Sequence, residues 1–170
     1  MRAPHLLIAA CMAASALAAP ATAAPADGAM KAAIIYNFTR FSTWRADRFA
    51  GSGSPVVLCV TASNPLAAEL AKLEGRPVGP RKLHIRRGHA FDRGCHAAFF
   101  AASEAGSADV AALAKQGVLT IGEDPQFARS GAIALVRVGR QIRFEINNRV
   151  AKSSGVEISS KLLRLAIAVR

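Results

Sequence analysis

The sequence predicts a single α/β domain: a mixed, mostly parallel sheet flanked by helices, with a C-terminal β-hairpin and a final helix. Apolar runs of strand length occur at residues 55–61, 95–102 and 118–121, and segments with helical spacing separate them. Strands that are apolar on both faces are typical of parallel sheets covered by helices. Residues 132–147 alternate as a hairpin does, which adds an antiparallel edge. A chain of 170 residues is long enough for one such domain and short for two.

The first 23 residues have the layout of a secretory signal peptide. A positive charge at Arg2 is followed by an uncharged apolar run from Leu6 to Ala19 and then by small residues. This run is shorter than the roughly 20 residues that a helix needs to span a bilayer. We therefore expect cleavage after residue 23, a mature domain over residues 24–170, and a periplasmic location. An alternative stays open, in which Cys11 is the lipidated cysteine of a lipoprotein signal.

The first half of the mature chain begins with a helix expected over residues 29–44. Its apolar residues fall at helical spacing and form one stripe: Met30, Ala33, Ile34, Phe38 and Phe41. A Gly/Ser-rich break leads into the strand at 55–61. Asn64 is a typical cap for a second helix, which Gly75 ends after Glu74. Residues 76–80 are expected to form a loop.

The second half continues the alternation of strands and helices. The expected elements are a half-exposed strand at 82–87, a buried strand at 95–102, an Ala-rich helical region at 103–115, a strand at 118–121 and a short helix at 124–129.

The hairpin at 132–147 has a clear turn signal. Gly139-Arg140 fits a two-residue turn with glycine at its first position. This register pairs Leu135 with Phe144 and Ile133 with Ile146 on one face. A final helix is expected to start near Ser159 or Ser160. Its apolar stripe consists of Ile158, Leu162, Leu165, Ala166 and Val169.

The chain is strongly basic, with 22 Lys and Arg against 11 Asp and Glu. The densest basic run is Arg81, Lys82, His84, Arg86, Arg87, His89 and Arg93. Such a run is either a solvated strand and loop or a docking surface for an acidic partner or a small anion. Candidate residues for that surface are Arg81, Lys82, Arg86, Arg87 and Arg93. Nucleic acid is not expected, because the protein is exported and aromatic residues make up only 6% of it.

Motifs of enzymes and cofactor sites are missing from the sequence. It contains no Gly-rich phosphate loop, no Gly-x-Ser-x-Gly and no Cys-x-x-Cys. We therefore expect neither an enzyme nor a bound cofactor. The best metal candidate is the group His84, His89, Cys95 and His96, but its spacing matches no compact zinc motif. Placing a dication among these basic residues also costs Coulomb energy.

Two cysteines remain in the mature chain, Cys59 and Cys95. An even pair in an oxidising compartment predicts a disulfide, which would fasten two strand-bearing segments together. Two buried free thiols are the alternative.

Four segments of the mature chain are familiar when taken together in order. They are Ala32–Trp44 (AAIIYNFTRFSTW), Leu73–Val78 (LEGRPV), Arg143–Asn147 (RFEIN) and Ile158–Ala166 (ISSKLLRLA). Their order and spacing resemble the YfiR family of periplasmic proteins, and the resemblance runs from about Met30 to the end of the chain. The family motif positions are Asn37, Phe38, Trp44, Glu145, Asn147 and Lys161.

The resemblance implies regulation by binding. YfiR-like proteins hold a membrane-bound diguanylate cyclase inactive through its periplasmic part, so that cyclic di-GMP stays low, which affects biofilm formation and motility. An outer-membrane lipoprotein can draw the inhibitor away, and family members can form homodimers. The resemblance also implies a disulfide between Cys59 and Cys95. A second, later cysteine pair of some members is absent here, because no cysteine follows Cys95. A periplasmic small-anion or solute-binding protein is the alternative function.

Individual motif residues allow two interpretations each. Phe38 and Phe41 are expected in the core, although Tyr36, Phe38 or Trp44 could serve as interface anchors. Asn147 is expected to cap a helix that follows it, Glu145 to lie on the exposed hairpin face, and Lys161 to be solvated or capping.

Overall fold

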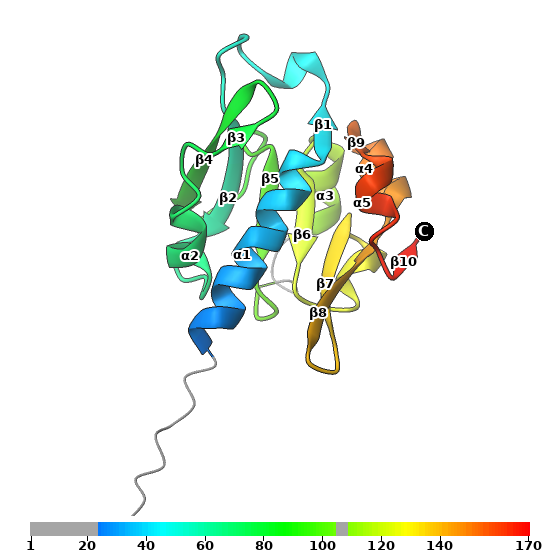
Figure 1. The fold of residues 1–170 in the computed structure, drawn as a ribbon. Coiled ribbons are helices and arrows are strands. Elements are labelled where there is room, and N and C mark those ends of the chain that lie inside the picture. Colours follow the sequence, from blue (N-terminus) through cyan, green and yellow to red (C-terminus); the bar gives the residue numbers. More distant parts are fainter. Residues whose placement is uncertain (1–23, 105–108) are drawn as a thin grey trace, which may run out of the picture.

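The computed structural model describes residues 24–104 and 109–170 (Figure 1). The expected signal peptide, including Cys11, lies outside the described residues. In chain order the elements are α1 (Ala24–Arg40), β1 (Ser42–Trp44), η1 (Ala46–Arg48), β2 (Val56–Thr61), α2 (Ala67–Ala71), β3 (Pro77–Val78), β4 (Arg81–Gly88), β5 (Ala97–Phe100), α3 (Val110–Lys115), β6 (Leu119–Gly122), η2 (Phe127–Arg129), β7 (Ile133–Val138), β8 (Gln141–Ile146), α4 (Asn148–Ser153), β9 (Val156–Ile158), α5 (Ser160–Leu163) and β10 (Ala168–Val169).

The main sheet confirms the predicted fold class. Its strand order is β10-β8-β7-β6-β5-β2-β4-β3, and the five central strands, from β7 to β4, are parallel. The chain moves outward from β2 to β4 and then crosses back past β2 to β5, β6 and β7. This reversal defines a doubly wound α/β sheet, with its switch point between β2 and β5.

Two hydrophobic clusters cover the two faces of the sheet. Alternate residues of β2 point to opposite faces, so Val56, Leu58 and Val60 belong to one cluster and Cys59 to the other. The first cluster packs under α1 and α2, which lie across the front of the sheet in Figure 1. The second packs under α3 and η2. No helix connects β4 to β5, and the loop carrying Phe91 covers part of the second face instead.

The hairpin forms as predicted. Leu135 pairs with Phe144 and Ile133 with Ile146. Gly139 has a φ of 58°, while Arg140, like every described residue other than glycine, has a negative φ, so the two-residue turn is type II′. That turn matches the twist of the flanking strands and fixes the register of β7 and β8.

The first helix is shorter at its C-terminus than the pattern predicts. α1 ends at Arg40, and Trp44 lies in the strand β1, so the expected helix to residue 44 is wrong there. β1 pairs antiparallel with β9, matching Ser42 with Ile158 and Trp44 with Val156. A β-branched residue and an aromatic residue after Arg40 suit a strand, and a partner distant in the sequence decides the outcome.

The predicted long C-terminal helix is also wrong. α5 is one turn, after which the backbone N–H of Ile167 donates to the Phe144 carbonyl and β10 joins the edge of the sheet beside β8. Leu165 and Val169, expected on a buried stripe, are 62% and 48% exposed. The N–H groups of Ile167 and Arg170 donate to the carbonyls of Phe144 and Ile146 on β8, and these bonds replace those of a continued helix.

Smaller differences concern element ends. α2 covers only Ala67–Ala71, because the Asn64 side chain accepts a bond from the Leu66 N–H and forms a turn before the helix. α3 starts at Val110, where the carboxylate of Asp109 caps the Ala112 N–H. The expected loop at 76–80 contains β3, which pairs with β4.

Candidate functional site

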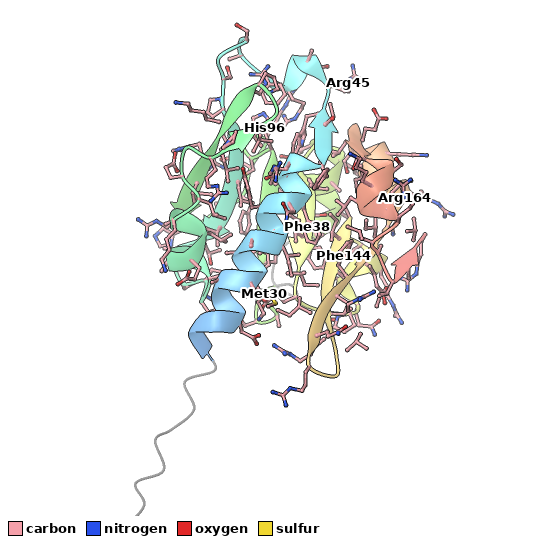
Figure 2. The ribbon with its side chains drawn as sticks, in the orientation of Figure 1. Met30, Phe38, Arg45, His96, Phe144 and Arg164 are labelled. Atoms are coloured by element: carbon pink, nitrogen blue, oxygen red, sulfur yellow. A yellow bond between two sulfur atoms is a disulfide. The ribbon has the colours of Figure 1, made fainter. Side chains whose placement is uncertain are left out.

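The four segments that carry the family resemblance pack against one another around α1. The Tyr36 hydroxyl donates to the Pro77 carbonyl oxygen at 2.7 Å, and the Arg76 guanidinium lies over the Tyr36 ring. The rings of Phe38 and Phe144 meet edge to face at 5.0 Å between centroids (Figure 2). The pairing of β1 with β9 brings the last segment to the first. The motif segments are therefore one packed unit.

The aromatic residues of the motif segments are buried and belong to the hydrophobic core. Phe38 is 1% exposed, Tyr36 5% and Trp44 6%. The indole N–H of Trp44 donates to the His96 carbonyl at 2.8 Å. The interpretation of these three side chains as interface anchors is thus wrong, because residues so fully enclosed do not face a partner. Phe38 is in the core as expected, and Phe41 is half-buried against it.

The remaining motif positions lie nearer the surface. Asn147 caps α4, its side-chain oxygen accepting from the Val150 N–H, and its amide donates to the Ala128 carbonyl. Glu145 forms an ion pair with Arg170 at 3.0 Å. Asn37 is half-buried and Lys161 is exposed. We expect these positions to matter for stability first, with Lys161 the one open to a partner.

The basic run along β4 does not form one patch. Val56 pairs with Leu83 and Cys59 with Arg86 in the parallel register of β2 and β4, so successive β4 side chains alternate between the faces of the sheet. Arg81 and Arg87 lie on the α1 face, whereas Lys82 and Arg86 lie on the disulfide face. Arg93 lies apart from them, in the loop before β5.

Two of these arginines already have structural partners. The Arg81 guanidinium stacks 3.7 Å from the centroid of the Phe49 ring and donates to the carbonyls of Gly51, Ser52 and Ser54. Arg86 forms an ion pair with Asp92 at 2.8 Å and contacts the Sγ of Cys95. Lys82 and Arg87 are exposed. These arrangements favour a solvated strand over the predicted docking surface.

The predicted disulfide between Cys59 and Cys95 is present and ties β2 to the short segment that leads into β5. It lies in the second cluster, on the side where no helix follows β4. A covalent link and the loop carrying Phe91 thus take the place of a packed helix. Closing the 36-residue separation stabilises the fold by about 4 kcal/mol at most, through the entropy of the unfolded chain.

His96 follows the disulfide and is 6% exposed. Its Nδ1 accepts from the Val57 N–H at 3.1 Å, and its Nε2 lies 3.1 Å from the Arg48 carbonyl oxygen, to which it donates in the neutral tautomer. The ring stacks on Phe49. Burial lowers the pKa of His96 to about 4, assisted by the charges of Arg48 and Arg81 and opposed by the bond to the Arg48 carbonyl.

These contacts exclude the zinc set considered from the sequence. The Cys95 sulfur is in the disulfide, and both ring nitrogens of His96 serve backbone groups. His84 pairs with Glu74. Within residues 24–104 and 109–170, no group of three or more His, Cys, Asp or Glu side chains could hold a metal ion.

A cavity of about 520 Å³ lies at the switch point of the sheet, where ligands of doubly wound folds commonly bind. Thr61 at the end of β2 and Phe100 at the end of β5 line it. Its carboxylate Glu104 accepts bonds from the Thr61 hydroxyl and the Asn64 amide and from the Ala101 N–H. Glu104 therefore holds the strand ends together.

A second opening, of about 540 Å³, lies beyond β1 between the ends of α3 and α4. Its walls carry Arg45, Arg48, Arg93, Lys115 and Lys152. Of these five residues, Arg93 alone belongs to the basic run that is visible in the sequence. The other four come from three separate segments: the turn after β1, the end of α3 and the end of α4. A local signal for these two helix ends is the glycine that follows each of them, Gly117 and Gly155.

Together, the doubly wound sheet, packed on both faces, and the Cys59–Cys95 disulfide define a small, disulfide-linked α/β domain. Comparison with known proteins agrees with this class. A crystal structure of a conserved domain protein from Vibrio cholerae O1 biovar El Tor superposes with a TM-score of 0.55 at 12% identity, covering 84% of this chain. This chain spans 60% of that one, and the likeness shows the fold alone. No curated protein matches.

The YfiR/HmsC-like family model matches residues 28–167, and the chain belongs to this family. The family consists of periplasmic regulators of diguanylate cyclases and is not catalytic. None of the helices in the described ranges is long and apolar enough to cross a membrane.

Proposed function

We propose that this protein represses a membrane-bound diguanylate cyclase by binding its periplasmic part, and so lowers cyclic di-GMP and limits biofilm formation. The match to the YfiR/HmsC-like family over residues 28–167 carries this proposal. A binding role agrees with a domain whose two faces are packed and whose strands are tied by a disulfide. Such a domain can favour the inactive state of a partner, and about 1.4 kcal/mol of differential affinity changes activity tenfold.

The proposal includes export through residues 1–23. The Cys59–Cys95 disulfide supports export, because disulfides persist in oxidising compartments outside the cytosol and are rare within it. Release by an outer-membrane lipoprotein and assembly as a homodimer belong to the same proposal. Light scattering of the mature protein tests the dimer.

The partner is tested by co-purification. Tagged protein is captured from cell envelopes after mild solubilisation, and bound proteins are identified by mass spectrometry. We expect a membrane protein with a periplasmic segment and a cytoplasmic cyclase domain, whose activity in membranes falls when the mature protein is added. Capture without any cyclase, or a cyclase whose activity is unaffected, would contradict the proposal.

A further inference from the structure

The opening beyond β1 is a strongly cationic groove, defined here by Arg45, Arg48, Arg93, Lys115 and Lys152. Arg45 and Arg48 come from the turn after β1, Arg93 from the loop before β5, and the lysines from the last turns of α3 and α4. Figure 2 shows Arg45 at the end of the molecule beside β1, away from the hairpin.

The charge of this groove is almost uncompensated. Among the residues that the structure describes, Asp47 is the only acidic one that lines it, and it pairs with the exposed Arg45 at 3.1 Å. Across the part of the chain that the structure describes, the other four cations of the groove form no salt bridge. The positive charges of Lys115 and Lys152 are stabilised by the C-terminal carbonyl groups of α3 and α4, since cations favour helix C-termini. No helix C-terminus explains the positive charges of Arg48 and Arg93 in the same way.

Arg48 lies at the floor of the groove and is half-buried. Its guanidinium donates to the carbonyls of Arg93 and Cys95 at 2.9 and 2.8 Å. Its Nε is buried and has no hydrogen-bond partner among the described residues. Gly117, with a φ of 83°, leaves room for it, because a Cβ there would lie 2.9 Å from Nε.

Arg48 also lies near a second positive charge, that of Arg93. Burial and the positive charge of Arg93 lower the pKa of Arg48. Two guanidinium groups held together with a single acidic neighbour repel one another, and an anion between them would replace this repulsion with charge-assisted hydrogen bonds. The arrangement is costly for the protein alone and favourable once an anion is present.

We propose that this groove docks an acidic segment, rich in Asp and Glu, of the protein partner. This inference rests on the proposed function and names the surface that it uses. Arginine forks bind carboxylates with two parallel bonds, and cations contributed by four segments of the chain fit several carboxylates of an extended peptide. Charge complementarity of this kind sets the encounter rate and the orientation of a complex.

The test uses the cyclase identified by co-purification, as its purified periplasmic segment. Calorimetry compares the wild type with an Arg93→Ser/Lys152→Ser variant. The matched control, Arg140→Ser/Arg143→Ser, removes two exposed charges from the hairpin at the other end of the molecule. All four side chains are exposed, so folding should be unaffected, and circular dichroism checks this.

We expect the groove variant to bind at least tenfold more weakly than the wild type, and the control within twofold of it. The difference should shrink at high salt. Equal binding by wild type and groove variant overturns the docking surface while leaving the proposed function intact. Failure of the wild type to bind any cyclase contradicts the proposed function itself.

Carbodiimide cross-linking gives a second readout, because it joins a lysine amine directly to a carboxylate in contact with it. We expect cross-linked peptides that join Lys115 or Lys152 to Asp or Glu of the cyclase. Cross-links confined to other lysines would contradict the groove. Titration with inorganic phosphate covers a small-anion site: phosphate binding lost in the groove variant, with cyclase binding unchanged, also overturns the proposal.

Discussion

The buried ring of His96 should make the stability of this protein depend on pH between 7 and 5. In the folded state both ring nitrogens are committed to the neutral form, Nδ1 as acceptor from Val57 and Nε2 as donor to Arg48. Protonating Nδ1 would set two N–H groups against each other in a site closed to water. Burial, assisted by the charges of Arg48 and Arg81, lowers the pKa of His96 from an ordinary 6.5 to about 4.

The direction and the size of the change in the free energy of unfolding follow from proton linkage. Below pH 6.5 the unfolded chain takes up a proton that the folded protein refuses, so the free energy of unfolding decreases as the pH falls. The loss is about 1.4 kcal/mol per pH unit in the middle of this window. It amounts to about 2 kcal/mol from pH 7 to pH 5 and is complete near pH 4.

Urea unfolding at pH 7, 6 and 5 measures this loss. The bond from the Ile85 N–H lowers the pKa of Glu74 from 4.5, and the bond from Arg86 lowers that of Asp92 from 3.8. The stability that these two carboxylates contribute is lost mainly below pH 5, where the unfolded chain takes up their protons, so most of the change between pH 7 and pH 5 is left to His96. A His96→Gln variant should lose most of the pH dependence, even if it is less stable throughout. His89→Gln, at an exposed histidine, should keep it. A wild type equally stable at pH 7 and pH 5, or a His96→Gln variant with an undiminished pH slope, would refute the reasoning.

Three further predictions concern stability. Replacing Cys59 and Cys95 by serine should lower the free energy of unfolding by up to about 4 kcal/mol, and the reducing agent dithiothreitol should do the same to the wild type but not to the variant; an unchanged melting temperature would contradict it. Phe38→Ala should cost about 3–5 kcal/mol in denaturant unfolding, because the ring is 1% exposed and packs on Phe144, whereas a loss below 1 kcal/mol would place the ring outside the core. Asn147→Ala should cost about 1–2 kcal/mol by removing the cap of α4, measured by thermal unfolding, with no loss counting against the cap.

The local pattern was enough to predict the fold class and the hairpin register. Buried strands such as β2 carry their own signal, since nearly all their residues are apolar, and Gly139 specifies its turn by itself. The ends of α1 and α5 were not predictable in this way. Trp44 pairs with Val156, and the N–H of Ile167 bonds to Phe144, so a distant partner overrides a helical pattern in each case.

In the candidate site, too, features that depend on local sequence could be predicted, and features that depend on distant residues could not. The disulfide could be predicted, because the mature chain expected from the sequence holds two cysteines and an oxidising compartment favours their pairing. The cationic groove could not, because Arg48 and Lys152 are far apart in the sequence and come together through the pairing of β1 with β9, the strand that follows α4. The basic run on β4 was visible in the sequence, but the alternation of a strand divides it between two faces.

The account depends most on repression of a cyclase from the periplasm, and the cellular level of cyclic di-GMP tests this most directly. Nucleotide is measured by mass spectrometry in a deletion strain, in one complemented with the full chain, and in one complemented with residues 24–170 alone. We predict a rise on deletion, a return to the original level with the full chain, and no return without residues 1–23. Unchanged cyclic di-GMP on deletion, or full rescue by the version without the leader, would contradict the account.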